Sequence, residues 1–316
     1  MPRLRLHPYH LPLRRPWVAA STTVSERRGW MVEINADDGA TGWGDCAVLP
    51  SAGEAGAAQM RWAIETALID LEARRRDVPL ATLLGARTLT VPVNAALGPL
   101  DEDCAERAVA AAAQGFRIGK IKVGIAPIEE ELARLRELAA TAGGTLFLRL
   151  DANRAWSYDD ATRFLHGIAD LPDLRVDGVE EPLAEPTCAS LGALQAALPF
   201  PIAVDESLPA LGVAPLLVSR AVRRFVLKPA RLGGVLPTLT LAQRAQRAGI
   251  EVVLTSVVDS AVGVAAAAHL AAAIGGPAHG LATSDWLARD VAPPLPIVAG
   301  RMLLPDAPGL GLTPAI

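Results

Sequence analysis

The feature that most constrains the fold is an alternation of short β-rich runs with alanine- and leucine-rich stretches, from Val91 onward. Runs such as LFLRLD and RFVLKP are typical of strands, and stretches such as EEELARLRELAATAGG have apolar residues at helical spacing. Repeated βα units of this size predict a parallel sheet, and eight such strands predict a closed (β/α) barrel. The predicted strands are 91–97, 118–123, 146–151, 176–181, 201–206, 224–229, 251–256 and 279–283.

The segments on either side of this repeat follow other patterns. Residues 30–46 contain two strand-like runs around the turn signal Asp38-Gly39, and a helix is expected from 54 to 84, ending near Val78-Pro79 and Gly85. We expect a loop at 15–30. We therefore predict a small α+β unit at 1–90, a barrel at 91–285, and a Pro/Gly-rich segment at 286–316 that returns to the first unit.

Composition narrows the class of protein. The 316 residues are 51% hydrophobic, so a sizeable core can be buried, and a net charge of −4 without a basic block argues against nucleic acid as a partner. Three widely spaced cysteines without a Cys-x-x-Cys pair favour a reduced, cytoplasmic protein without disulfides or a zinc site. The N-terminal residues lack the apolar region of a secretory signal. The apolar run 261–276 is too short to cross a membrane and is predicted to be a buried helix.

Charged and polar side chains recur at the ends of the predicted strands, where barrel enzymes build their active sites. These residues are Lys120, Lys122, Asp151, Glu180, Asp205, Lys228 and Ser256. The spacing is one βα unit each time, for example 29 residues from Lys122 to Asp151 and again from Asp151 to Glu180. The sequence therefore predicts that they converge on one rim.

Three carboxylates on neighbouring strands would repel one another without a cation. Hard oxygen ligands suit Mg²⁺, with Mn²⁺ as an alternative. The lysines would then lie on either side of the metal, with the α-carbon of a small carboxylate substrate between them. A lysine near a second cation has a lowered pKa and can act as a general base, while the metal stabilises the enediolate formed on proton loss.

Taken singly, each of these residues has an ordinary structural explanation. A Lys-x-Lys pair is common on exposed edge strands, and an Asp at a strand end often caps the next helix. Glu181 and Glu206 fit a loop, and His269 fits a packed or capping side chain. These explanations do not account for six polar strand ends in phase with the fold.

At these residues the chain resembles the enolase superfamily, in its muconate-lactonizing-enzyme-like subgroup. The matching motifs are KIK, LRLDANRAW, VEEPL, AVDES and VLKPARLGG, and IETALIDLEARRRDVPLATLLG resembles the helix that precedes the barrel. The resemblance covers nearly the whole chain. It implies a modified (β/α)₇β TIM-type barrel with an α+β capping domain formed by the N-terminal segment and the C-terminal tail.

The resemblance also implies roles for the strand-end residues. Asp151, Glu180 and Asp205 would bind Mg²⁺, Lys122 and Lys228 would flank the substrate α-carbon, and Lys120 would lie beside Lys122. Within the subgroup the chain is most similar to the o-succinylbenzoate synthases of menaquinone biosynthesis, because of its length and its LDANRAW and TSVVDSAVG segments. That similarity implies a lyase that dehydrates a cyclohexadiene carboxylate, with Lys122 as base and then acid and Lys228 stabilising the intermediate.

Substrate contacts are expected from Asn153, Ser256, Asp259, Ser260 and Arg28, together with Trp17, Arg27 and the Asp259–Gly263 backbone. Asp45 stands where relatives commonly have Glu after Gly-Trp-Gly.

Two other reactions remain open. A racemase or epimerase of N-acyl amino acids or dipeptides uses the same two lysines, although the eighth predicted strand lacks the Asp-x-Asp feature of dipeptide epimerases. A cycloisomerase is a further alternative. A sugar-acid dehydratase is disfavoured because the seventh predicted strand ends in Thr-Ser rather than His, and a barrel without catalysis would leave this set unused. A homo-oligomer is compatible with the family.

Overall fold

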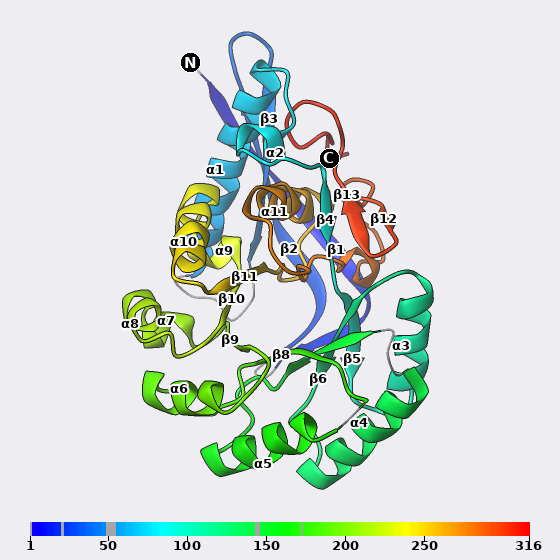
Figure 1. Cartoon of the computed structure of the whole chain (residues 1–316). Coiled ribbons are helices and arrows are strands. Elements are labelled where there is room, and N and C mark those ends of the chain that lie inside the picture. Colours follow the sequence, from blue (N-terminus) through cyan, green and yellow to red (C-terminus); the bar gives the residue numbers. More distant parts are fainter. Residues whose placement is uncertain (1, 20–21, 49–54, 143–145, 172) are drawn as a thin grey trace.

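Seven strands form a parallel sheet that curves through the molecule (Figure 1). The computed structural model describes residues 2–19, 22–48, 55–142, 146–171 and 173–316. The order is β11-β10-β9-β8-β7-β6-β5, so each strand lies beside its neighbour in the sequence. The strands are β5 (Ala95–Pro99), β6 (Ile118–Lys122), β7 (Phe147–Asp151), β8 (Val176–Glu180), β9 (Ile202–Val204), β10 (Arg224–Leu227) and β11 (Glu251–Leu254). The prediction of a parallel sheet built from successive βα units is confirmed.

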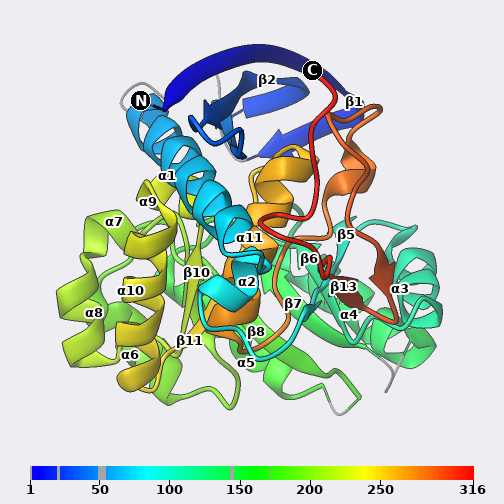
Figure 2. The same ribbon diagram turned by 90° about the horizontal axis from the view of Figure 1, so that it is seen from above.

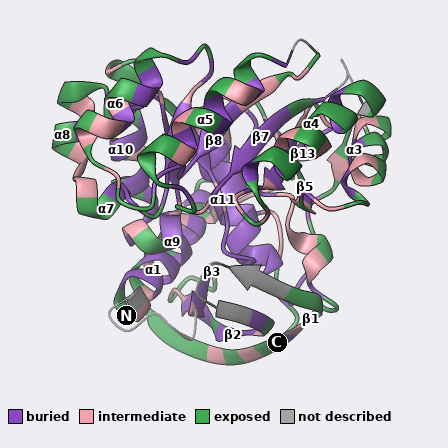
Figure 3. Cartoon of the chain, turned by 90° about the horizontal axis from the view of Figure 1, so that it is seen from below, coloured by how far each residue is buried: buried purple, intermediate pink, exposed green. Residues whose placement is uncertain are grey.

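Helices follow the strands and cover the outer face of the sheet (Figure 1). They are α3 (Cys104–Ala113), α4 (Ile128–Ala142), α5 (Tyr158–Ala169), α6 (Cys188–Ala196), α7 (Leu208–Leu211), α8 (Val213–Ser219), α9 (Pro229–Leu232), α10 (Val235–Arg247) and α11 (Ala261–Ile274). In α5 the side chains of Ala161, Phe164, Leu165 and Ile168 are buried, which is the stripe that a helix packed on a sheet requires. The outward faces of these helices are exposed (Figure 3).

The two edges of the sheet differ from the prediction. The expected first strand at 91–97 is divided into β4 (Thr90–Pro92) and β5, and β4 pairs with the C-terminal tail. The expected eighth strand at 279–283 is not a regular strand in the described chain. It forms single bridges from His279 to Val93 and from Gly280 to Thr255, so it lies between both edges. Gly280 suits this seam because a Cβ there would meet the Thr255 hydroxyl at 2.8 Å.

The inward side chains of the sheet form ionic and apolar groups. Arg149 is 2% exposed and donates from Nε to Asp177 at 2.8 Å, and Arg224 donates from Nη1 to the same carboxylate at 2.6 Å. Beside these lies a small apolar cluster of Ala203, Val226 and Val253. Because the buried guanidinium groups are paired with a carboxylate, this part of the interior is held by charge as well as by packing.

The N-terminal segment forms a three-stranded antiparallel sheet with the order β1-β2-β3. Its strands are β1 (Arg3–Ala19), β2 (Thr22–Asn35) and β3 (Thr41–Val48). The two runs predicted around Asp38-Gly39 are therefore strands, whereas the prediction of a loop at 15–30 is wrong. Pro8 and Pro12 obscured β1 in the sequence, but proline is tolerated on an edge strand where its missing N–H faces solvent.

The helix predicted at 54–84 is divided in two. α1 (Ala55–Arg75) packs on β3, and α2 (Leu80–Leu83) follows a break at which Asp77 has a positive φ of 56° and Pro79 precedes α2. Val32 and Cys46 of the sheet pack with residues of α1 in a separate small core. The sequence predicts one helix that ends near Val78-Pro79 and Gly85, whereas α1 already ends at Arg75 and α2 is a separate turn. The predicted start at 54 lies outside the described residues.

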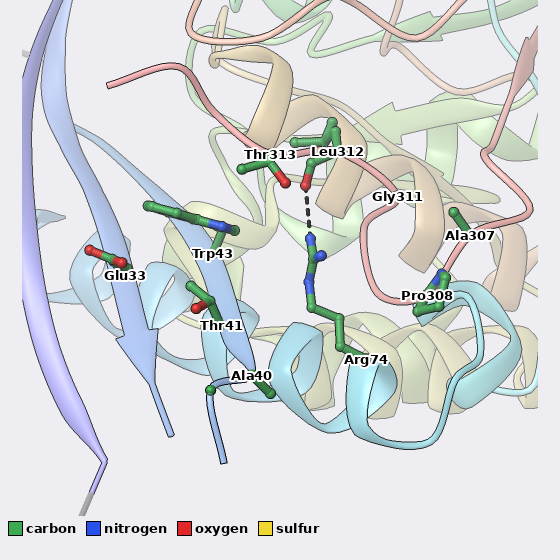
Figure 4. A pocket seen from close by; sticks show the side chains of 11 residues that line it. Glu33, Ala40, Thr41, Trp43, Arg74, Ala307, Pro308, Gly311, Leu312 and Thr313 are labelled. Atoms are coloured by element: carbon green, nitrogen blue, oxygen red, sulfur yellow. Dashed lines mark hydrogen bonds between the residues drawn. The ribbon is translucent and has the colours of Figure 1, made fainter. Parts of the chain in front are cut away.

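The C-terminal tail returns across the molecule. It contains η1 (Ser284–Trp286), β12 (Ile297–Val298) and β13 (Arg301–Leu303), and β13 pairs with β4. Beyond β13, Arg74 of α1 donates to the carbonyl of Leu312 at 2.8 Å (Figure 4). A pocket of about 650 Å³ lies there, lined by Trp43, Arg74 and Thr313 among others. None of its lining residues belongs to the strand ends of the parallel sheet.

Helix α11 lies between the N-terminal sheet and the parallel sheet (Figure 2). Nearly every residue of it is buried, as predicted for 261–276. No described helix has the length and apolar character needed to cross a bilayer. His269 of α11 joins two distant segments, because its Nδ1 accepts from the Ala81 amide at 3.0 Å and its Nε2 lies 3.3 Å from the Leu310 carbonyl.

Burial lowers the pKa of His269 to about 4, so the folded chain holds this ring neutral while the unfolded chain protonates it near 6.5. Its contribution to stability is therefore present above pH 6.5 and is lost as the pH falls toward 4. We expect His269→Gln to be less stable than the parent at pH 8. This deficit in unfolding free energy should shrink by roughly 2 kcal/mol at pH 5. Urea unfolding at both values measures it, with exposed His166→Gln as control; an unchanged deficit would contradict the assignment.

Candidate active site

The carboxyl ends of the central strands carry charged side chains on one edge of the sheet. Lys122 pairs with Asp151 across β6 and β7, and Asp151 pairs with Glu180 across β7 and β8. Asp205 follows β9 directly, and Lys228 follows β10. Because parallel strands end on the same edge, the polar strand ends predicted from the sequence do converge on one rim.

Each ammonium group on the rim contacts a carboxylate. Lys120 Nζ lies 2.8 Å from Asp151 Oδ2 and donates to both Glu180 oxygens at 2.8 Å. Lys122 Nζ lies 2.7 Å from Asp151 Oδ2, and Lys228 Nζ forms an ion pair with Asp205. The rim therefore pairs three lysine side chains with three carboxylates, which lowers the cost of burying these groups.

The ion pairs shift the pKa values of these groups in different directions. Burial alone would raise the pKa of Asp151 and lower that of Lys120, but their mutual attraction outweighs it, so the pKa of Asp151 falls and that of Lys120 rises. Burial lowers the pKa of Lys228 to about 7, with Arg231 and Lys120 adding to the effect and Glu180 opposing it. A lowered pKa favours the neutral amine, which can accept a proton.

Lysine occurs nowhere else in the chain. Of the 30 Lys and Arg residues, the other 27 are arginine, and all three lysines lie on this rim. Arginine stays protonated in proteins, whereas lysine can give up its proton when its surroundings favour the neutral amine. This bias was visible in the composition and is the signal that sequence reasoning from motifs left unused.

Glu181 is a buried acceptor that links the strand end after β8 to the one after β9. It is 1% exposed, and Oε1 accepts from the Asp205 amide at 2.6 Å and the Ser207 amide at 2.9 Å, while Oε2 accepts from the Ser207 hydroxyl. Its φ is 49°, in the left-handed region that non-glycine residues seldom occupy. The interpretation of Glu181 as a loop residue missed this function, because hydrogen bonds between two strand ends cannot be seen in one motif.

The donor set fits Mg²⁺ in chemical kind. Asp151, Glu180 and Asp205 supply carboxylate oxygens from neighbouring strand ends, and the ammonium of Lys120 shows that a cation can lie between two of them. Within the described ranges, no three His, Cys, Asp or Glu side chains form a group that could hold a metal as they stand. The contacts explain this, since each carboxylate is directed at an ammonium group instead.

Four of the expected substrate-binding residues follow β7 and β11. Asn153 lies on the rim, where its Oδ1 contacts Lys122 Nζ. Ser256 follows β11, and its hydroxyl lies 2.9 Å from that of Thr283. Asp259 and Ser260 lie in the turn before α11, and the Ser260 hydroxyl donates to Asp45 at 2.8 Å.

The structure does not bring Arg28 to the rim. It is exposed and donates to Glu26 at 2.5 Å. Neighbouring residues of a strand face opposite sides, so Arg28 points away from the side that Arg27 faces. Arg27 instead is 1% exposed and donates to the carbonyl of Val258, after β11. The side chain of Trp17 lies outside the described part of the chain.

A family model described as enolase C-terminal domain-like matches residues 103–315. The chain belongs to the enolase superfamily. Its relatives place this superfamily enzyme in the muconate-lactonizing-enzyme-like subgroup, so the resemblance found in the motifs is confirmed at that level.

Three relatives illustrate the range of reactions. The chain is 30% identical to the L-Lys-D/L-Arg epimerase of Methylococcus capsulatus, over 96% of each chain. It is 29% identical to the crystal structure of a dipeptide epimerase from the same species complexed with Mg and the dipeptide L-Arg-D-Lys, with a TM-score of 0.85 and 98% of both chains covered. Muconate cycloisomerase 1 of Acinetobacter baylyi is 30% identical over 66% of this chain and 56% of its own.

Removing Glu181 should disturb the rim without touching a lysine. We expect Glu181→Ala to lower the free energy of unfolding by roughly 2–4 kcal/mol, because it leaves buried donors of Asp205 and Ser207 without an acceptor. Chemical denaturation measures this, with Glu185→Ala, an exposed neighbour, as the matched control. Equal stability of the two variants would contradict the proposed role.

Proposed function

We propose that this enzyme is a Mg²⁺-dependent racemase or epimerase that inverts the α-carbon of an N-acylated amino acid. The observation that carries the proposal is the placement of the lysines. Lys122 at the end of β6 and Lys228 after β10 lie on opposite sides of the carboxylates on β7, β8 and β9. Two bases facing one carbon from opposite sides can remove a proton on one face and return one on the other.

The lysines are prepared for these roles by their contacts. Asp151 and Asn153 orient the Lys122 ammonium, and burial lowers the pKa of Lys228 to about 7. Lys120, whose pKa is raised, is the permanent positive charge beside them. It would pair with the substrate carboxylate or balance the carboxylates of the rim.

Asp151, Glu180 and Asp205 would hold the Mg²⁺ ion. When bound, the metal supplies positive charge that acidifies the proton next to a carboxylate and offsets the charge of these three side chains. The structure of a relative complexed with Mg and a dipeptide supports this assignment.

The substrate class follows from what the relatives have in common. A dipeptide and an N-acyl amino acid both present a free carboxylate, an α-proton and an amide nitrogen on that carbon. Similarity to an L-Lys-D/L-Arg epimerase and an N-succinyl-L-Arg/Lys racemase supports this class. Residues 279–283 here contain no carboxylate that could pair with a free ammonium on the acyl part, which favours an N-acyl amino acid over a dipeptide.

The finer architecture belongs to the same proposal. We propose that 91–285 is a modified (β/α)₇β barrel closed by the bridges of His279 and Gly280. Residues 1–90 and the tail 286–316 would form a capping domain over its rim. Contacts between Arg27 and Val258 and between Arg74 and Leu312 support this division.

The o-succinylbenzoate synthase prediction has less support. The relatives described above are epimerases, a racemase and a cycloisomerase. Dehydration by one base would use Lys228 only for its charge and not for proton transfer. A role as a lyase of menaquinone biosynthesis stays a prediction. A reduced, cytoplasmic location also stays a prediction, and the three cysteines are free in the structure.

The two-base mechanism predicts a stereochemical split. Lys122→Arg and Lys228→Arg keep the charge but cannot accept a proton, so each should exchange the α-proton of only one enantiomer, and the two should prefer opposite enantiomers. Proton NMR in deuterated water with Mg²⁺, using both enantiomers of N-succinyl and N-acetyl amino acids and of dipeptides, measures this. Arg244→Lys, on an exposed face of α10, is the control. Loss of exchange for both enantiomers in one variant only would favour a single-base reaction, and an aromatic product from the cyclohexadiene carboxylate would favour the synthase.

Metal binding is testable without a substrate. We expect Mg²⁺ to stabilise the protein by about 2.7 kcal/mol at a concentration a hundred times its dissociation constant. Asp205→Asn and Glu180→Gln should abolish this gain, and exposed Asp159→Asn should keep it. Thermal unfolding with and without Mg²⁺ measures the effect, and an unchanged gain in Asp205→Asn would exclude Asp205 as a ligand.

A further inference from the structure

The turn between β11 and α11 has a strained backbone. Val258 has a φ of 60°, in the left-handed region that a β-branched residue adopts only under constraint. Positive φ values also occur at Asn153, Arg154 and Glu181, which follow β7 and β8 on the same rim. Strain of this kind persists only where surrounding contacts over-determine it, and it concentrates at functional sites.

The contacts that hold this turn come from the N-terminal sheet. Arg27 of β2 donates from Nε to the carbonyl of Val258 and from Nη2 to the carbonyl of Ala47, both at 3.1 Å. It therefore ties the strained residue to β3. Val257 packs against Val24 of β2, which adds an apolar contact beside the guanidinium.

Asp45 of β3 holds the other end of the turn. It is 2% exposed and accepts from the Ser260 amide at 3.0 Å, the Ser260 hydroxyl at 2.8 Å and the Tyr9 hydroxyl at 2.7 Å. Ser260 is also the N-cap of α11. At Gly263 a Cβ would meet the Asp45 carboxylate at 2.6 Å, so the helix can approach β3 only because this position is glycine.

Two polar atoms in this contact have no hydrogen-bond partner among the described residues. They are Arg27 Nη1 and Asp259 Oδ1, and both residues are more than nine-tenths buried. Burial and the charge of Asp45 raise the pKa of Asp259 to about 7. A donor and an acceptor left unpaired at one interface are costly, so packing alone does not account for these polar side chains.

We propose that Arg27 and Asp45 are positioning residues that fix the Ser256–Ser260 turn on the rim and thereby determine which acyl group the site accepts. The conformation of the turn is set from the N-terminal sheet rather than by β11 itself. Ser256 and the Val257–Asp259 backbone then present fixed polar groups beside Lys228, whose strand β10 pairs with β11. The hydrogen bonds from Arg27 and to Asp45 that fix this turn are called the clamp below. The effect on substrate choice rests on the proposed racemase or epimerase function, whereas the clamp itself does not.

Amide hydrogen exchange tests the clamp without any substrate. Arg27→Met keeps the apolar stem and should speed exchange in residues 257–264 about ten-fold while leaving β6 and β7 unchanged. Arg28→Met, the adjacent residue on the opposite face of β2, should have no effect. Asp45→Ala should speed exchange of the Ser260 amide in particular, because its acceptor is removed.

A second substitution separates positioning from general packing. Glycine at position 258 adopts a positive φ without strain, so Val258→Gly combined with Arg27→Met should restore slow exchange. Arg27→Lys should exchange at an intermediate rate, because lysine keeps a donor at this position. Slow exchange in Arg27→Met, or no restoration by Val258→Gly, would overturn the clamp.

Kinetics on the N-succinyl and N-acetyl amino acid panel test the consequence. We expect Arg27→Met to raise KM about ten-fold for the preferred acyl group and to narrow the difference in KM between N-succinyl and N-acetyl substrates, with kcat within about two-fold, since the lysines are untouched. A fall in kcat at constant KM would overturn the role in substrate choice. If the parent exchanges none of these acids, the proposed function fails, while the hydrogen-exchange result still decides the clamp.

Discussion

In-register parallel pairing is the constraint on which the rest of the structure depends. It places Lys122, Asp151 and Glu180 side by side on three neighbouring strands. Asp205 and Lys228 follow β9 and β10 further along the same edge, because Glu180 is in register with Ala203. A shift of one residue in any strand would turn its charged side chain from the rim to the helix-covered face. The charges therefore favour the correct register as well as forming the site.

The register also explains what could be predicted from the sequence. Strands that recur once per βα unit place their ends on one edge, so Asp151, Glu180 and Lys228 could be assigned to a common rim from spacing alone. β1 was missed because its prolines resemble a loop, and only its position at a sheet edge makes them acceptable. The βα repeat predicts an eighth strand at 279–283, although this segment forms isolated bridges at His279 and Gly280 instead of a regular strand.

The site was less predictable wherever one residue acts through another. Nothing in VEEPL shows that Glu181 binds the amides of Asp205 and Ser207, since this depends on two strand ends being close. The choice between Arg27 and Arg28 likewise depends on which face of β2 meets the parallel sheet. Two adjacent arginines give no sign in the sequence of which one points inward. Motifs report the groups that react, whereas the groups that hold them depend on tertiary contacts.

The confinement of lysine to the rim has a practical consequence. Apart from the chain's amino terminus, the only primary amines of the protein are those of Lys120, Lys122 and Lys228. A reagent selective for amines therefore reacts only with this site and the amino terminus, and the arginines do not react. The same chain could be followed by amine-directed isotope labelling, and each side-chain signal would belong to a group on the rim.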